Sequence, residues 1–267
     1  MTRPTSSSRP ASAARKKTVK PFGSVAFVGA GPGDPQLLTV RAVELLAKAD
    51  VVVTESQDAE FVRRYCREGV EVVDGSLGDD GQPLSHAVRA RLVAKAAKGG
   101  GLVVRLLDGD PFLYATGSEE AAACAKAGIP FEVVPGVSSI TAVPAYAGIP
   151  LTSAKHREVR VVNVAEGSVN WSDLGAGTAT LVLLSATAVM GDVAKSLIAA
   201  GRAPETPVAL TQSGTTTGQR TVVSGDGSAS VRLSATGPLD EAARIGRDLA
   251  ADLLAEGAAD LMMERVT

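Results

Sequence analysis

Short apolar runs alternate with longer mixed stretches along most of this chain. Runs rich in Val, Ala and Leu occupy residues 25–28, 50–54, 70–73, 101–107, 131–134, 159–162, 180–184 and 207–210. Nearly continuous apolar runs of this length are typical of strands covered on both faces. The stretches between them predict helices at residues 37–48, 61–68, 85–98, 119–126 and 190–200. Strands that alternate with helices predict an α/β fold with mostly parallel sheets.

The residue types available for the core are small. The chain is 45% hydrophobic but only 3% aromatic, so its core must consist mainly of Ala, Val and Leu. The helix predicted at residues 85–98 is rich in Ala, and Val88, Leu92 and Ala96 recur in it at four-residue spacing. We expect these three side chains to face the sheet.

Two of the predicted strands end in small polar and turn-forming residues. The strand at 101–107 is followed by Gly109, which permits a tight turn. Asp110 comes next and precedes Pro111, which disfavours helical backbone geometry at Asp110. The strand at 131–134 is followed by a proline–glycine break and then by Ser138 and Ser139. Ligands of open α/β sheets bind at the carboxyl ends of strands, so these residues predict two sides of one pocket. Two ordinary βα turns are the alternative.

A glycine-rich loop at residues 29–35, GAGPGDP, follows the first strand and precedes a helix. A dinucleotide-binding turn has this order, but its GxGxxG pattern needs glycine where Asp34 stands, and Asp34 would repel a pyrophosphate. No Gly-Lys-Ser/Thr follows, which excludes a Walker loop. The loop therefore predicts a ligand that approaches the backbone closely and is not polyanionic. A tight turn without a ligand is the alternative.

Length, charge and rare residues narrow the function classes. A chain of 267 residues is long enough for about two domains. Its net charge of −2 argues against a general nucleic-acid binder, and no apolar run is long enough to cross a membrane. The chain has only two histidines and contains neither CxxC nor HExxH spacing, so we expect no metal site. Cys66 and Cys124 occur without a secretory signal, so we expect reduced thiols and a cytoplasmic protein.

Two polar segments lie outside the regular pattern. Residues 1–22 contain Ser, Pro, Ala, Arg and Lys but no acidic residue, which predicts a flexible basic tail; an organelle transit peptide is the alternative. Residues 211–220 follow the strand at 207–210 and end at Arg220. Arg220 is a candidate for binding a substrate carboxylate through its guanidinium fork, and an exposed hairpin arginine is the alternative.

Four segments, in one order, resemble the tetrapyrrole methylase family and within it the uroporphyrinogen-III C-methyltransferases. They are VGAGPGDPQLLT at 28–39, RLLDGDPF at 105–112, GIPFEVVPGVSSITAVPAYAGIPLT at 128–152, and residues 214–220. The resemblance covers about residues 24–223. The chain is similar to the methylase part of bifunctional methyltransferase/uroporphyrinogen-III synthase polypeptides.

The resemblance implies two α/β domains with S-adenosylmethionine (SAM) bound in the cleft between them. By position, the residues implied to line the SAM site are Pro32, Gly109, Asp110, Leu113, Ser138, Ser139, Ser185 and Gly214. Glu55 is implied as the acid–base carboxylate. The implied reaction methylates pyrrole carbons of uroporphyrinogen III and gives precorrin-2, for sirohaem or cobalamin. A homodimer is implied as well.

The chain departs from the family at four positions. Glu55 stands where the family has aspartate, Thr116 where it has arginine, and Ser185 where it has methionine. The lysine expected after the strand at 70–73 has no counterpart in the sequence Asp74-Gly75-Ser76. Two of these changes remove positive charge from a site for a polycarboxylate. The alternatives are therefore a methylase of a later corrin precursor and a SAM-binding homologue without turnover.

The C-terminal segment departs from the family in another way. Residues 224–262 resemble the end of hydroxymethylbilane synthase, without any of that enzyme's catalytic core. Their pattern predicts a strand at 230–233, a turn at Gly237-Pro238 and an amphipathic helix at 240–256. The predicted divisions of the chain are the tail at 1–22, an N-terminal domain at 23–135, a C-terminal domain at 136–223, and an atypical closing strand and helix at 224–267.

Overall fold

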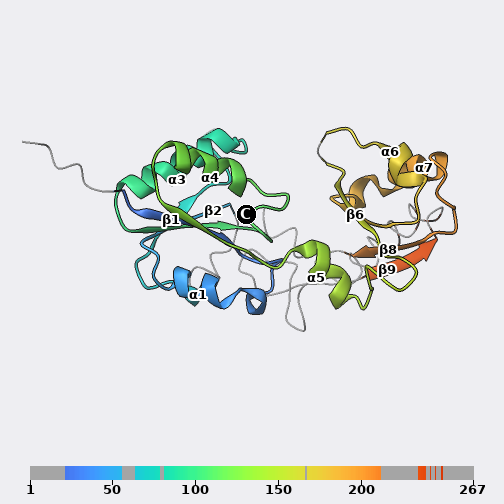
Figure 1. Cartoon of the computed structure of the whole chain (residues 1–267), viewed down its shortest axis with the longest axis horizontal. Helices are drawn as coiled ribbons and strands as arrows, with labels where there is room; N and C mark the ends of the chain where they lie inside the picture. The colour runs from blue at the N-terminus through green and yellow to red at the C-terminus, as the bar shows by residue number, and fades with distance from the viewer. Residues whose placement is uncertain are drawn as a thin grey trace, which may run out of the picture.

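The computed structural model of the protein describes residues 22–55, 64–78, 81–165, 167–211 and 234–238, together with residues 241, 244 and 248. These residues form two lobes, with helix α5 (Ser139–Tyr146) between them (Figure 1). Of the described residues, those between 22 and 134 form the first lobe, and those between 159 and 211 together with 234–238 form the second. The residue bounds of the predicted domains stay a prediction.

The first lobe contains one five-stranded sheet. Its strands are β1 (Ser24–Gly29), β2 (Val51–Thr54), β3 (Glu71–Asp74), β4 (Leu102–Leu107) and β5 (Phe131–Val134). They lie in the order β3-β2-β4-β1-β5, and every neighbouring pair is parallel. The predicted α/β class with mostly parallel sheets is therefore confirmed. The order places β1 between β4 and β5, so the ends of these three strands are neighbours.

Helices cover both faces of this sheet (Figure 1). Helix α1 (Val40–Leu46) lies on one face, and helices α3 (His86–Lys98) and α4 (Gly117–Lys126) lie on the other. Val104 and Leu106 of β4 belong to the core under α1, whereas Val103 and Leu107 belong to the core under α3 and α4. Coverage on both sides explains why these strands read as continuous apolar runs.

The start of the first helix and the inward face of α3 differ from the predictions. Residues Pro35–Leu37 form a separate 3₁₀ helix, η1, and α1 begins only at Val40, because Thr39 caps it by accepting a hydrogen bond from Ala42 N at 3.1 Å. A side chain that bonds the backbone in this way favours a new helix start over a continuous helix. In α3, the predicted inward residues are only half-buried, and the buried residues are instead Ala90, Val93 and Ala97.

The second lobe has smaller sheets. Strands β6 (Val159–Asn163) and β7 (Thr180–Leu184) pair in parallel, and β8 (Pro207–Thr211) pairs antiparallel with β9 (Ser234–Pro238). Helices α6 (Trp171–Gly175) and α7 (Met190–Ala199) pack on them, and a second 3₁₀ helix, η2 (Thr187–Val189), precedes α7. Buried apolar side chains from these elements form their own core, including Leu174, Met190, Val193, Leu197 and Leu210.

The predicted turn at Gly237-Pro238 is wrong. Both residues belong to β9, where Pro238 lies opposite Pro207 and Gly237 opposite Val208. Proline is tolerated here because the pair lies at the end of the ladder, where its missing N–H matters least. The strand predicted at 230–233 lies outside the described residues, as do all but three residues of the helix predicted at 240–256. None of the described helices combines the length and apolar character needed to cross a membrane.

Candidate active site

Three glycines meet where β1, β4 and β5 end. A Cβ atom added to Gly29 would lie 2.5 Å from the carbonyl oxygen of Gly109 and 2.5 Å from the Cα of Gly136. A Cβ atom added to Gly136 would lie 2.0 Å from the same carbonyl oxygen. All three distances are too short for a side chain, so only glycine permits these backbones to pack together. We refer to Gly29, Gly109 and Gly136 as the glycine cluster.

The loop that follows β1 is hydrogen-bonded to the turn that follows β4. Gly31 N donates to Gly109 O at 3.3 Å, and Gly109 N donates to Gly31 O at 2.8 Å. Pro32, predicted to line the SAM site, is the next residue of this loop and is half-buried. The glycine loop and the Gly109 turn, separated by more than 70 residues of sequence, therefore form one structural unit.

Asp110 connects the end of β4 to the end of β5. Its Oδ1 accepts a hydrogen bond from Phe112 N at 2.9 Å, and its Oδ2 accepts one from Gly136 N at 3.1 Å. The two strand ends that the sequence predicted to form sides of one pocket are thus joined directly. Asp110 orders the loops of the candidate site through these bonds, whatever contact it makes with a ligand.

Ser138 and Ser139 begin the helix that leads toward the second lobe. Ser138 is the N-cap of α5, and its Oγ accepts a hydrogen bond from Ile140 N at 3.2 Å. A Cβ atom added to Gly109 would lie 3.9 Å from the Cα of Ser138. The predicted residues Gly109, Asp110 and Ser138 are therefore close to one another.

Asp34 joins the glycine loop to the far end of α5. Its side chain is buried; its Oδ1 accepts a hydrogen bond from Gln36 N at 2.8 Å, and its Oδ2 accepts one from Tyr146 Oη at 3.4 Å. The residue that breaks the dinucleotide pattern thus fixes the loop against α5. Sequence reasoning did not find this role, because Tyr146 lies 112 residues farther along the chain.

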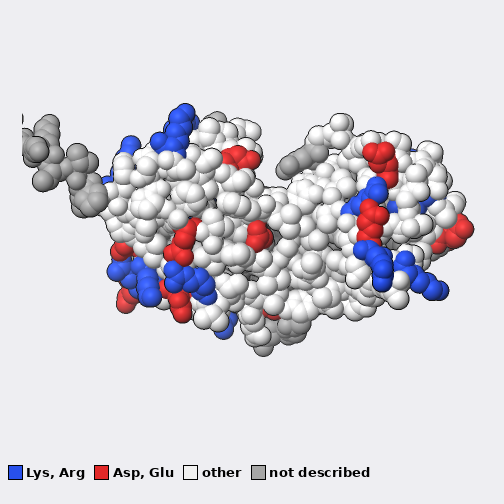
Figure 2. Space-filling model, viewed as in Figure 1, with Lys and Arg blue, Asp and Glu red and all other residues white. Residues whose placement is uncertain are grey.

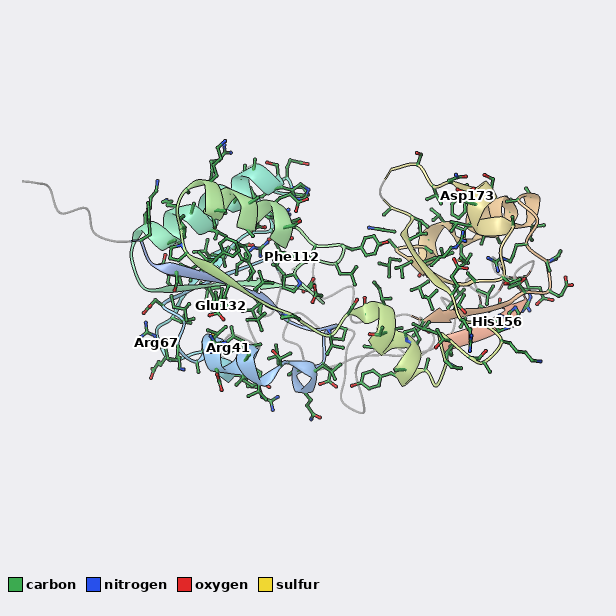
Figure 3. The ribbon with its side chains drawn as sticks, viewed as in Figure 1. Arg41, Arg67, Phe112, Glu132, His156 and Asp173 are labelled. Atoms are coloured by element: carbon green, nitrogen blue, oxygen red, sulfur yellow. The ribbon has the colours of Figure 1, made fainter. Side chains whose placement is uncertain are left out.

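The loop after Asp110 extends from the first lobe toward the second (Figure 3). Its residues Phe112, Leu113 and Tyr114 all have exposed side chains. Tyr114 Oη donates to Val161 O of β6 at 2.9 Å, and Tyr114 has a positive φ of 52°. Ser185, at the end of β7, has a positive φ of 57°. Strained backbone of this kind is enriched at functional sites, and both residues lie in segments that the resemblance assigns to the site.

Not all predicted site residues are brought together. Ser185 is exposed in the second lobe, and no hydrogen bond of its side chain to the glycine cluster occurs among the described residues. Gly214 and Arg220 lie outside the described residues. The roles of the predicted site residues in SAM and substrate binding stay predictions.

Glu55 lies just after β2, in a network of charged side chains. Arg105 and Glu120 are both 0% exposed, and Arg105 donates from Nε to Glu120 Oε2 at 2.8 Å and from Nη2 to Glu120 Oε1 at 3.0 Å. Arg105 Nη2 also donates to Glu55 Oε1. Arg89 of α3 forms an ion pair with the same oxygen, Nε to Oε1 at 3.1 Å.

Burial by itself would lower the pKa of Arg105. The hydrogen bonds and charges of Glu120 and then of Glu55 outweigh that effect and raise its pKa above the usual value. Arg105 therefore remains a cation inside the core. A signal for it was present in the sequence, since it is the one charged residue in the apolar run at 101–107.

The positions where the family carries cations have other roles here. Thr116 Oγ1 donates to Glu120 Oε1 at 2.6 Å, and Asp74 Oδ1 accepts a hydrogen bond from Ser76 N at 2.7 Å. The hydrogen bonds from the Ser76 side chain and backbone lower the pKa of Asp74. On the face shown in Figure 2, Lys and Arg side chains gather along the outer edge of the first lobe and over the middle and lower part of the second lobe.

Known proteins with similar sequences indicate the family of this chain. The sequence profile of the family "Tetrapyrrole (Corrin/Porphyrin) Methylases" matches residues 24–227. The siroheme synthase of Azotobacter vinelandii is 42% identical over 210 residues, which are 77% of this chain and 45% of that protein. The siroheme synthase of Pseudomonas fluorescens is 44% identical over 204 residues, which are 74% of this chain and 44% of that protein. This chain spans less than half the length of these relatives.

Solved structures agree with the sequence matches. A cobalt precorrin-4 methyltransferase superposes with a TM-score of 0.70 at 26% identity, covering 84% of this chain and 89% of its own. The uroporphyrin III C-methyl transferase of Thermus thermophilus superposes with a TM-score of 0.66 at 30% identity, covering 83% of this chain and 91% of its own. Another structure of the Thermus thermophilus enzyme, complexed with S-adenosylhomocysteine, has a TM-score of 0.65 at 29% identity and covers the same shares.

The sequence and the fold thus lead to one family. The glycine loop, the Gly109 turn and the Ser138 cap all fall within the matched residues 24–227, which make up more than half of the chain. The protein therefore belongs to the tetrapyrrole (corrin/porphyrin) methylases.

Proposed function

We propose that the protein transfers methyl groups from SAM to pyrrole carbons of uroporphyrinogen III, giving precorrin-2 after two rounds. The observation that carries this proposal is the likeness to the uroporphyrin III C-methyl transferase of Thermus thermophilus, at 30% identity over 83% of this chain and 91% of that one. The match to siroheme synthases at 42% identity supports the same reaction.

The candidate site suits SAM as the methyl donor. The glycine cluster presents backbone without side chains, so a ligand can approach the ends of β1, β4 and β5 closely. SAM carries a sulfonium cation and no phosphate, which fits two loops that contain Asp34 and Asp110 rather than lysine. Pro32, Gly109, Asp110, Leu113, Ser138, Ser139, Ser185 and Gly214 are the residues proposed to bind it.

The proposed reaction requires the protein to align SAM with the tetrapyrrole and to remove a proton from the methylated ring. The S–CH3 bond must point at the nucleophilic ring carbon, because such alignment supplies much of the acceleration of a group transfer. Glu55 is proposed to take the proton from the methylated ring, and Arg220 to hold a substrate carboxylate. A homodimer and a cytoplasmic location are further expectations. Both Cys66 and Cys124 are free thiols in the structure, as a reducing compartment requires.

Methylation of a later corrin precursor is the second candidate. The cobalt precorrin-4 methyltransferase gives the higher TM-score, 0.70 against 0.66. Incubation with labelled SAM and either uroporphyrinogen III or a cobalt-containing precorrin separates the two. We expect mass spectrometry to show that uroporphyrinogen III gains two methyl groups. Label in the precorrin alone would favour the second candidate, and label in neither would contradict both.

A further inference from the structure

The two oxygens of the Glu55 carboxylate are in different environments. Oε1 is bonded by Arg105 Nη2 and by Arg89 Nε, the latter at 3.1 Å. Oε2 has no hydrogen bond or ion pair to any described residue. The side chain is 34% exposed, so it lies at the boundary between the buried network and solvent. One oxygen is therefore anchored and the other is available.

The two arginines that anchor Oε1 are themselves held in place. Arg105 is fully buried, its Nε and Nη2 bond both oxygens of Glu120, and its Nη1 donates to Leu106 O at 2.9 Å. Arg89 also donates from Nε to Gly75 O at 3.0 Å, and its side chain is 11% exposed. Arg105 cannot turn without breaking several hydrogen bonds, and Arg89 cannot turn without breaking its hydrogen bond to Gly75 O, so Glu55 is anchored to two restrained arginines.

Stability alone does not explain the bonds to Glu55. The charge of Arg105 is already matched by Glu120, and a buried ion pair is at best weakly stabilising relative to apolar residues. The bond from Nη2 to Glu55 instead reaches out of the core to the carboxyl end of β2, which neighbours β4 and therefore ends at the same edge of the parallel sheet as the glycine cluster. A group that must accept a proton in a fixed direction needs such an anchor, since small misplacements of reacting groups are costly.

We propose that Arg105 and Arg89 are positioning residues that hold Glu55 through Oε1 and present Oε2 as the atom that takes the proton. This inference rests on the proposed function. In that reaction a ring double bond attacks the methyl carbon of SAM, a C–C bond forms, and the electrons of the S–CH3 bond remain on sulfur. The methylated ring is then a cation, and it becomes neutral when a proton passes from it to Oε2 of Glu55.

The test is a mutant cycle between the anchor and the carboxylate. The pair variant Arg105→Met/Glu120→Leu removes the buried charges together, so the core stays apolar and Glu55 keeps only its ion pair with Arg89. We expect kcat with uroporphyrinogen III to fall about 10²-fold, with unchanged KM and unchanged affinity for S-adenosylhomocysteine. Glu55→Gln should lower kcat by about 10²-fold or more. Adding the pair variant to Glu55→Gln should cause no further loss, because the arginines act only through Glu55.

A matched control removes another ion pair of the same lobe. Arg41 on α1 binds both oxygens of Glu132 on β5 at 2.9 Å, on the outer surface (Figure 3). The pair variant Arg41→Met/Glu132→Met should leave kcat unchanged. If the buried pair variant does not fold, Arg89→Met gives the same test, since it removes the second donor to Oε1 and leaves the buried pair intact.

The outcomes separate this inference from the function on which it rests. Losses that add in the combined variant, or wild-type kcat in both the buried pair variant and Arg89→Met, would overturn the positioning role while the methyltransferase activity stands. A wild-type protein that methylates no tetrapyrrole would overturn the proposed function and this inference with it.

Discussion

Arg105 and Glu120 form an ion pair, 2.8 Å from Nε to Oε2, in which neither side chain is exposed to solvent. The pair lies under α4, on a sheet face that is otherwise built from Val103, Phe27 and other apolar residues. Two opposite charges occupy the place of two core side chains. The stability of the folded protein therefore depends on both charges being present.

The first prediction is that single variants of this pair are far more harmful than the double variant. Arg105→Met or Glu120→Leu alone leaves one charge buried without its partner, which should lower the free energy of unfolding by about 3–5 kcal/mol. The double variant should be as stable as the wild type, or more stable. Urea unfolding followed by circular dichroism measures the free energy of unfolding of the two single variants and the double variant. A double variant as unstable as the singles would show that apolar side chains cannot fill this site.

The second prediction concerns Asp110. Because its carboxylate accepts hydrogen bonds from Phe112 N and Gly136 N, Asp110→Ala should loosen both loops and weaken S-adenosylhomocysteine binding by about 1–3 kcal/mol. Isothermal titration calorimetry measures the affinity. Asp192→Ala is the control, since that carboxyl group is 84% exposed on α7 and should leave the affinity unchanged. An unaltered affinity in Asp110→Ala would remove Asp110 from the site.

The third prediction concerns the glycine cluster. Gly136→Ala places a methyl group 2.0 Å from Gly109 O, and backbone cannot move aside as a flexible side chain can. We expect a loss of about 1–3 kcal/mol or more in the free energy of unfolding, together with loss of S-adenosylhomocysteine binding. Gly177→Ala is the control, because the added methyl group would lie 3.9 Å from Ala179 N, which is an ordinary van der Waals contact. Equal thermal melting of the two variants would contradict the prediction.

The fourth prediction concerns the segment after Val223. Truncation there removes β9, which pairs with β8 from Pro207 to Thr211, and leaves β8 with an unpaired edge. We expect the truncated protein to be insoluble or to melt at a much lower temperature. Expression yield and differential scanning calorimetry provide the measurement. A truncated protein that is soluble, melts cooperatively and binds S-adenosylhomocysteine normally would show that the segment is dispensable.

The strands were predictable because helices cover both faces of the first sheet. β5 has the predicted bounds, as does β7 of the second lobe, since apolar content alone marks such strands. The break between η1 and α1 was missed, because it depends on a single hydrogen bond that the Thr39 side chain accepts from Ala42 N. Gly237-Pro238 was read as a turn because the pairing with β8 cannot be seen from neighbours in the sequence.

The candidate site was predictable only in part. Turns after β1, β4 and β5 were expected to hold ligands, because carboxyl ends of parallel strands meet at one edge. The role of Arg105 was not predicted, because its partners Glu120 and Glu55 are 15 and 50 residues away in sequence. Local patterns contain no information on such contacts, which exist only once the strand order places β2 beside β4.

The contact among Gly29, Gly109 and Gly136 also limits how such a protein can be diversified. The three loops that contain these glycines are packed backbone against backbone, so an insertion or a bulky residue in one forces simultaneous changes in the others. These three loops are thus a poor target for library design. Thr187, Ala188 and Val189 of the second lobe are exposed and lie outside this contact, so they are better positions for randomisation.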